Sequence, residues 1–109
     1  MIQMYRGTTP SIALLVAGVD LSFQDTWPVV VVTIKNGGTE IDLQRDLLVI
    51  EHTDAGCSVT FVLTQAQTLA MYKSMPMLVQ LRAKDASGRA IATDIASVAV
   101  DDIVKDGEI

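Results

Sequence analysis

The sequence predicts a small all-β domain, an antiparallel sandwich of seven or eight strands with one short helix. Turn-forming residues recur about every eight to twelve residues, the spacing typical of a sandwich or barrel. The segments between them are rich in β-branched and alternating apolar residues. Nothing in the pattern alternates strands with long helices, as a parallel sheet requires. The 109 residues match the usual size of one domain, so residues 1–109 are expected to form a single unit.

Four strands are expected in the first half of the chain, at residues 1–5, 11–16, 28–35 and 39–43. In the second of these, Ile12, Leu14 and Val16 share one face. The third is a valine-rich run that suits a central strand with both faces covered. Pro28 begins this strand because proline cannot donate to the ladder. The sequence Asn-Gly-Gly at 36–38 then predicts a tight hairpin turn.

The second half predicts strands at 47–52, 57–63, 77–85 and 90–100, with a short helix at 64–72. Thr64 and Gln67 have the spacing of a capping box at the start of that helix. Leu69 and Tyr72 are three residues apart and are expected to share a helical face. The alternation of the last strand slips near Asp94, which predicts either a bulge or a crossing between sheets.

Antiparallel strands with one covered face per sheet indicate an immunoglobulin-like β-sandwich, and a small barrel is the main alternative. The chain lacks the Cys…Trp…Cys spacing of true immunoglobulin domains, because Cys57 is its only cysteine. That cysteine is expected to lie inside a strand as a small hydrophobe. No disulfide framework and no metal staple are expected.

The composition is unusually apolar for so small a domain. Hydrophobic residues make up 50% of the chain and charged residues 19%, and the mean hydropathy is +0.37. A small domain has a high ratio of surface to volume, so part of this apolar surface is expected to lie at an interface. This predicts a homo-oligomer or a component of a larger assembly.

The net charge of −5 and the absence of a basic run argue against nucleic acid and against anionic membrane surfaces as partners. The N-terminus lacks the pattern of a signal peptide. No apolar run approaches the ~18 residues of a membrane span. The chain is therefore expected to be made in a cytoplasm.

Two groups of residues are candidates for chemistry. His52 is the only histidine, and nothing in the sequence supplies the oriented partner that a general base needs. Asp101, Asp102 and Asp106 cluster near the C-terminus, but their spacing lacks the Asp/Asn pattern of a known calcium loop. A solvated histidine and a solvated acidic tail are the preferred interpretations. Neither a cofactor nor a metal ligand set is predicted.

Sugar binding and catalysis have weaker support. Trp27 is the only tryptophan, and the few aromatic residues do not form the platform that a sugar module needs. The two glycines at 37–38 belong to a hairpin turn and not to a phosphate-binding loop. No nucleophile elbow is present. We therefore expect no enzyme and no catalytic residues.

Several segments resemble small proteins encoded in the tail-gene regions of Firmicute prophages. They are MIQMYRGTTP at 1–10, VTIK at 32–35, LTQ at 63–65, VQLR at 79–82, DASGR at 85–89 and IVKDGEI at 103–109. Similar immunoglobulin-like modules form the N-terminal domain of some phage upper baseplate proteins. The likeness lies in the general pattern of strands and turns and in no single motif, so no functional residue can be carried over from it. It implies a virion or tail-assembly role.

These observations together lead to a functional expectation. The chain is expected to be a structural protein of a phage tail or baseplate, binding other tail proteins or copies of itself and located in the virion. The alternative is a non-catalytic module that binds carbohydrate or calcium. The valine-rich strand is a candidate for an extra covered face, with burial in its own core as the simpler interpretation. The candidate interface residues lie near both termini and at the only tryptophan: Ile2, Met4, Tyr5, Trp27, Ile103, Val104 and Ile109.

Overall fold

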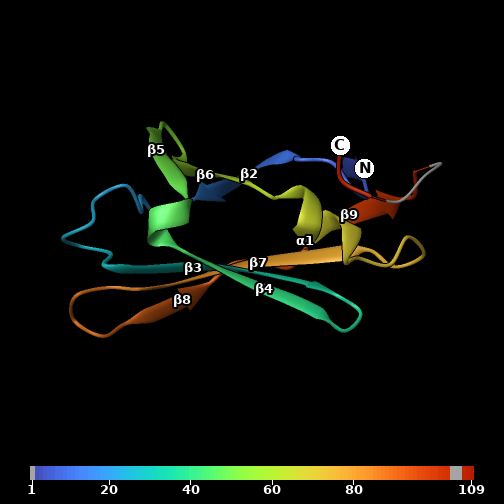
Figure 1. The fold of residues 1–109 in the computed structure, drawn as a ribbon. Helices are drawn as coiled ribbons and strands as arrows, with labels where there is room; N and C mark the ends of the chain where they lie inside the picture. The colour runs from blue at the N-terminus through green and yellow to red at the C-terminus, as the bar shows by residue number, and fades with distance from the viewer. Residues whose placement is uncertain (1, 104–106) are drawn as a thin grey trace.

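The computed structural model describes residues 2–103 and 107–109, and it shows an elongated two-layer β-sandwich of 47 × 24 × 23 Å (Figure 1). One layer is a six-stranded sheet in the order β1-β9-β7-β3-β4, with β8 also pairing with β7. The other is a three-stranded sheet in the order β2-β6-β5. The strands are β1 (Ile2–Tyr5), β2 (Ser11–Ala17), β3 (Val29–Asn36), β4 (Thr39–Gln44), β5 (Val49–Thr53), β6 (Gly56–Val62), β7 (Met77–Lys84), β8 (Ala90–Ala92) and β9 (Ala96–Asp101).

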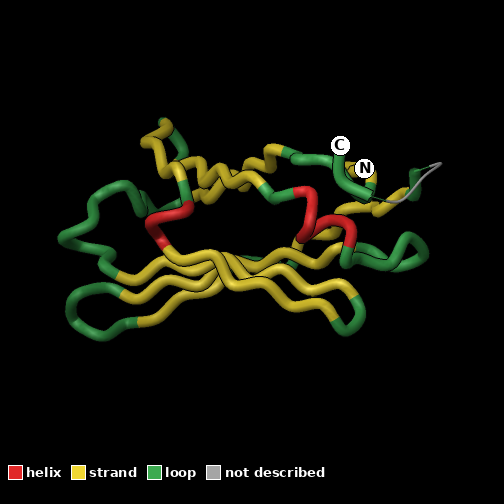
Figure 2. Tube along the Cα trace, in the orientation of Figure 1, coloured by secondary structure: helices red, strands yellow, loops and turns green. Residues whose placement is uncertain are grey.

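The strand order is that of an immunoglobulin-like sandwich, which confirms the predicted fold class. All strand pairs are antiparallel except β1 and β9, which run parallel with Ile2 opposite Val98. The purely antiparallel prediction is wrong at this pair. The chain leaves β1 and enters β2 in the other layer, so β1 is placed beside the last strand instead of its neighbour in sequence. Figure 2 shows the two layers of strands with loops gathered at both ends of the sandwich.

The core lies between the two sheets and consists of alternate residues of the facing strands. In β3, the side chains of Val30, Val32 and Ile34 have no solvent-exposed area. From the opposite layer, Val59 and Phe61 of β6 pack against this surface. On the outer face of β3, Val29 is 46% exposed, and Val31 and Thr33 are half-buried by side chains of the neighbouring strands. The valine-rich strand is thus central in its sheet, and within this chain only one of its faces is buried.

The slip in alternation near Asp94 is a bulge, one of the two predicted explanations. Both β8 and β9 pair with β7, so the chain does not cross between sheets. Residues 93–95 lie opposite only Gln80 and Leu81, which leaves one extra residue in this strand. The Thr93 hydroxyl accepts a hydrogen bond from the Leu81 N–H at 3.1 Å. The side chain thereby replaces a backbone acceptor of the interrupted ladder.

Two short helices connect the layers. The first is a 3₁₀ helix, η1 (Arg45–Leu47), in place of the predicted start of the fifth strand. The second is α1 (Gln65–Leu69), which crosses from β6 in one sheet to β7 in the other as predicted. The capping box between Thr64 and Gln67 is confirmed. The expectation that Leu69 and Tyr72 share a helical face is wrong, because the helix ends at Leu69 and Tyr72 is 55% exposed beyond it.

Candidate interaction surfaces

The N-terminal strand β1 forms one edge of the six-stranded sheet, next to β9. Along this strand, Tyr5 is 52% exposed, whereas Met4 is only 4% exposed. The side chain of Met4 is therefore part of the core of its own domain and is not available to a partner. The backbone of Ile2 pairs with Val98 at the start of the strand. Of these candidates, Tyr5 has an exposed side chain that a partner can contact.

The segment after β9 lies beside the residues that follow β1, and Arg6 holds it there through Asp102. The Arg6 guanidinium donates to the Leu69 and Met71 carbonyls, both at 2.8 Å, and to Asp102 Oδ1 at 2.5 Å. Ile103 is half-buried beside Gly7 and Leu69. Ile109 is fully exposed, and Val104 lies outside the described residues. Both termini are close together at one end of the sandwich (Figure 1).

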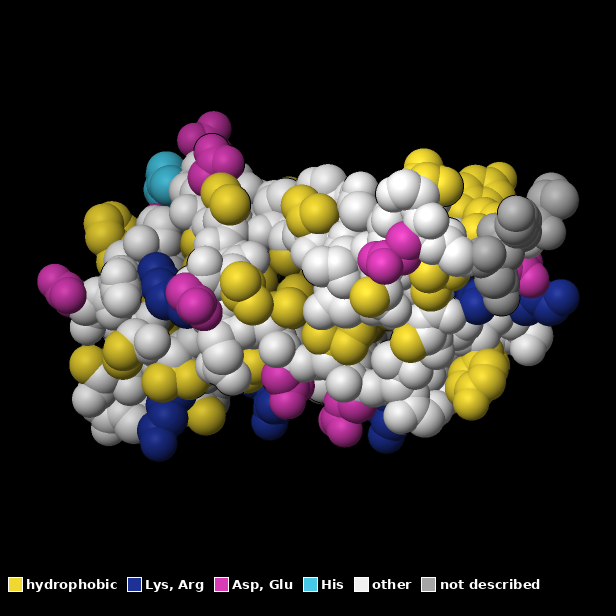
Figure 3. Space-filling model, viewed as in Figure 1, with side chains coloured by type: hydrophobic (Ala, Val, Ile, Leu, Met, Phe, Trp, Pro, Cys, Tyr) yellow, Lys and Arg dark blue, Asp and Glu magenta, His cyan; other side chains and the backbone are white. Residues whose placement is uncertain are grey.

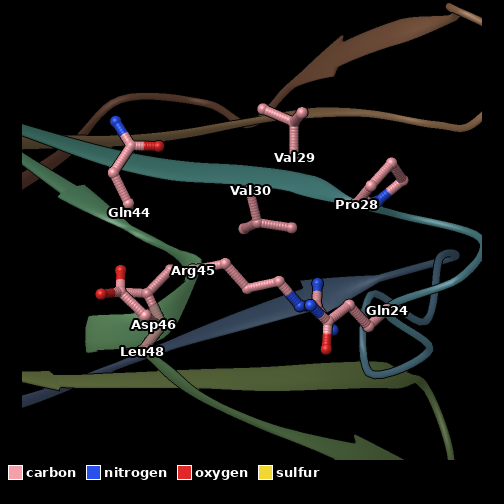
Figure 4. A pocket seen from close by; sticks show the side chains of 8 residues that line it. All are labelled: Gln24, Pro28, Val29, Val30, Gln44, Arg45, Asp46 and Leu48. Carbon is pink, nitrogen blue, oxygen red and sulfur yellow. The ribbon is translucent and has the colours of Figure 1, made fainter.

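Trp27 lies at the other end, in the loop that precedes β3, so it does not join the terminal candidates. It is partly buried against the core. Arg45 holds this loop by donating to the Trp27 carbonyl at 2.9 Å and the Ser22 carbonyl at 3.2 Å. Beside it is an open hollow of ≈ 560 Å³, which Figure 4 shows with Arg45 reaching across it toward Gln24. The Arg45 side chain therefore connects η1 to the loop before β3 by hydrogen bonds.

The clearest exposed apolar patch lies on the outer face of the three-stranded sheet. Leu15 is 83%, Val62 59% and Val49 56% exposed. The strand register places these side chains and Ala13 around Thr60, because Ala13 and Val49 both lie opposite Thr60. Adjacent positions on one face of a sheet are close enough for their side chains to form a continuous surface. We call Ala13, Leu15, Val49 and Val62 the outer patch.

A groove continues from the outer patch to the side of the sandwich. It has a volume of ≈ 330 Å³ and is lined by Leu43, Leu47, Val49, Thr60, Phe61, Val62, Thr64 and Gln67. It forms because β5 pairs only with residues 56–60 of β6, so Phe61 and Val62, which pair with β2 on one side, have no strand on the β5 side in the described structure. Figure 3 shows hydrophobic side chains at the surface between the two layers on this side of the molecule.

His52 pairs with Asp20, so the structure supplies an oriented carboxylate that the sequence did not reveal, but Ser22 does not complete a nucleophilic triad with them. His52 Nδ1 lies 2.7 Å from Asp20 Oδ2, and the imidazole is 69% exposed. The Ser22 hydroxyl donates to the other oxygen of Asp20 at 2.5 Å and so does not contact the histidine. In a nucleophilic triad the histidine lies between the serine and the carboxylate. The hydrogen bonds from Ser22, followed by the one from His52, lower the pKa of the Asp20 carboxyl.

The C-terminal aspartates show no ligand set within the described part of the chain. Asp102 pairs with Arg6, and Lys73 Nζ lies 3.5 Å from its other oxygen. The backbone N–H of Ile103 and the Arg6 side chain hold the pKa of this carboxyl below its usual range. No group of three or more His, Cys, Asp or Glu residues among those described could hold a metal ion. Asp106 lies outside the described residues.

Trp27 and Tyr72, the aromatic residues considered for sugar binding, lie at opposite ends of β3 and do not form one shared platform. Tyr72 is fixed to Asn36, at the end of β3, by a 2.6 Å hydrogen bond to the Asn36 side chain. Trp27 precedes the start of the same strand, and the eight residues of β3 span roughly 26 Å. The two aromatic side chains therefore cannot contact the same sugar ring.

The outer patch was not among the sequence-based candidates, although the sequence contains a signal for it. In the run Leu14-Leu15-Val16 both faces of the strand are apolar, so one large side chain must point away from the core.

A search of protein-family models and of curated proteins found no match to this chain. Across the described residues, no helix is long and apolar enough to cross a membrane.

Proposed function

We propose that this chain is a structural module that acts by binding other proteins, in the tail or baseplate of a phage or prophage, without catalysing a reaction. The observation that carries the proposal is the outer patch, where Leu15, Val49 and Val62 are each more than half exposed. Contiguous apolar patches larger than roughly a few hundred Å² are rare on soluble monomers and often mark interaction sites. The adjoining groove lined by Leu47 and Phe61 extends this apolar surface.

The tail setting comes from the resemblance of the sequence, and the physical features agree with it. Tail components pack repeatedly around a symmetric tube or baseplate, so they need apolar contact surface and accessible sheet edges. This chain has both, because β2 and β5 end the three-stranded sheet and β1 and β4 end the larger one. The binding of sugar or calcium remains the alternative, with no specific contact in its favour.

Site-specific photo-cross-linking in the native host tests the proposal. A photoreactive residue at Val62 is expected to give covalent adducts with a tail or baseplate protein after prophage induction. The matched control carries the same residue at Lys84, which lies on the outer face of the other sheet. Gradient-purified tail particles are expected to contain the chain at a fixed ratio to the other tail proteins. Recovery of the chain only as a free protein, without adducts at Val62, would refute the proposal.

A further inference from the structure

Strand β2 leaves one side of the three-stranded sheet open. It pairs with β6 over its full length, from Ser11 opposite Val62 to Ala17 opposite Gly56. On its other side it has no strand partner among the described residues. In the constant-type immunoglobulin order this sheet has a fourth strand in that position. Here the N-terminal strand β1 pairs with β9 in the other sheet, so the position beside β2 is vacant.

The phase of the β2–β6 ladder shows which backbone groups face this vacancy. The Leu63 N–H donates to the Pro10 carbonyl, and the Gly18 N–H donates to the Ala55 carbonyl. Hydrogen-bonded pairs alternate along an antiparallel ladder, so the even-numbered residues of β2 face β6. The N–H and C=O groups of the odd-numbered residues therefore point outward: Ser11, Ala13, Leu15 and Ala17.

This edge lacks the features that normally keep an exposed strand from pairing. Natural edges are protected by charged side chains, prolines or bulges. Residues 11–19 contain no charge and no proline, and the register of β2 is unbroken. A hollow of ≈ 470 Å³ runs along the edge, and Asp94 is the only charged residue that lines it. The edge is thus suited to an uncharged, extended strand.

We propose that β2 pairs antiparallel with β2 of a second copy, about a two-fold axis at Leu14, which joins the two three-stranded sheets into one. This inference rests on the proposed function and names one partner for it. In this register Ala13 lies opposite Leu15 of the second copy, and Ser11 lies opposite Ala17 of the second copy. Both members of each pair have outward backbone groups, so every free N–H and C=O from Ser11 to Ala17 gains a partner.

The strand is complementary to itself in side chains as well as in backbone. On the outer face the large Leu15 meets the small Ala13 of the second copy, and on the inner face Ile12 meets Val16 of the second copy. Shifting the axis by one residue, to Ala13 or Leu15, leaves one end of the strand unpaired. No charge on either strand opposes the contact. The axis at Leu14 is therefore the register that uses the whole strand.

The contact is small, and this sets the expected strength of the dimer. The seven residues of β2 span roughly 24 Å, so the strand pair and the hollow beside it bury less than a standard interface. We expect a dimer that dissociates on dilution in the micromolar range. Each copy carries a net charge of −5, so added salt should strengthen association by screening the repulsion between copies.

Sedimentation velocity over about a hundredfold range of protein concentration tests the dimer. Ala13→Pro removes one outward N–H, which an edge strand tolerates, and Leu15→Lys places a charge on the same edge. Both variants should weaken the dimer at least tenfold. His52→Pro on the opposite edge of the sheet and Val62→Lys, which lies in the outer patch but on β6, are the matched controls and should leave the dimer unchanged. Thermal melting verifies that each variant is folded.

Amide hydrogen exchange gives a readout that does not depend on a substitution. Exchange at Ala13 and Leu15 should slow as the wild-type concentration rises, whereas exchange at the even-numbered residues should not change. A wild type that stays monomeric over the whole range overturns the inference. So does a loss of the dimer in Val62→Lys equal to that in Leu15→Lys, which would indicate face-to-face packing. A monomer that still cross-links to a tail protein through Val62 refutes this dimer and leaves the proposed function intact.

Discussion

The side-chain amide of Asn36 binds both backbone groups of Tyr72: its oxygen accepts from the Tyr72 N–H at 2.6 Å, and its nitrogen donates to the Tyr72 carbonyl at 3.2 Å. The same nitrogen lies 3.0 Å from the Met75 carbonyl. Asn36 is only 1% exposed, so one buried side chain at the end of β3 holds Tyr72 and Met75 of the segment between α1 and β7. This segment contains no regular element that could hold itself in place.

Replacing Asn36 with alanine is expected to lower the free energy of unfolding by about 2–3 kcal/mol, because it removes three part-buried hydrogen bonds to the backbone of Tyr72 and Met75. The measurement is urea unfolding, read as a shift in midpoint at constant slope. Thr39→Ala is the matched control, since Thr39 makes an exposed hydrogen bond from the same hairpin to the Ala70 carbonyl. That control should cost about 0.5 kcal/mol. Equal losses in both variants would contradict the anchoring role of Asn36.

Gly56 is expected to tolerate no side chain. A Cβ atom at this position would lie 2.1 Å from the Val16 carbonyl oxygen and 2.8 Å from that of Val19, and both are backbone atoms. Gly56→Ala should therefore force β6 away from β2 and cost about 3 kcal/mol or more, at the upper end of overpacking substitutions. Gly38→Ala is the control, because nothing lies within 4 Å of its Cβ position. Thermal melting of both variants checks this, and a Gly56→Ala protein as stable as Gly38→Ala would refute it.

Most of the fold follows from local sequence. The strict alternation of Cys57, Val59, Phe61 and Leu63 set the buried face of β6, and all four residues are buried in the structure. The capping residues at Thr64 likewise predicted where α1 begins. These features depend on neighbouring residues, and so a single sequence contains them.

The features that the sequence did not predict depend on contacts between distant segments. The parallel pairing of β1 with β9 joins the two ends of the chain, and no local pattern encodes it. At the end of the helix, the Leu69 carbonyl accepts a hydrogen bond from Arg6, more than sixty residues away in the sequence. Among the candidate interface residues, the sequence does not distinguish Met4 from Tyr5, because the burial of Met4 depends on where β1 lies beside β9. The outer patch likewise depends on the register of β2, β5 and β6, which the sequence alone does not specify.

Arg6 is expected to be irreplaceable by lysine. Its planar guanidinium reaches two carbonyls at the end of α1 and the Asp102 carboxylate at once, whereas a single ammonium group cannot match this geometry. Arg6→Lys should cost about 2 kcal/mol. Arg82→Lys is the comparison, because Arg82 is exposed and its hydrogen bond to Thr33 is long, at 3.4 Å. The measurement is the urea midpoint of each variant relative to wild type. Similar shifts in midpoint for the two variants would count against the role of Arg6.

Asp85 is expected to titrate abnormally low because it closes the turn between β7 and β8. The Ser87 hydroxyl donates to Asp85 Oδ1 at 2.7 Å, and the backbone N–H groups of Arg89 and Ser87 donate at 2.9 and 3.0 Å. These hydrogen bonds, the one from the Ser87 hydroxyl first, lower the pKa of this carboxyl from 3.8. Because the pKa is lower in the folded state, the stabilisation is complete above the unfolded value. It is lost as the pH falls through the folded value.

Ser87→Ala removes the largest of these contributions, so the pKa of Asp85 should rise toward 3.8. Carbon-detected NMR titration of the Asp85 carboxyl measures this directly in both proteins. Asp85→Asn provides the matching test of stability. The difference in urea midpoint between wild type and Asp85→Asn should be largest at neutral pH and should shrink as the pH falls below about 4, because protonation removes the charge that the turn stabilises. A pKa of Asp85 that does not change in Ser87→Ala would show that the backbone of the turn alone controls its titration.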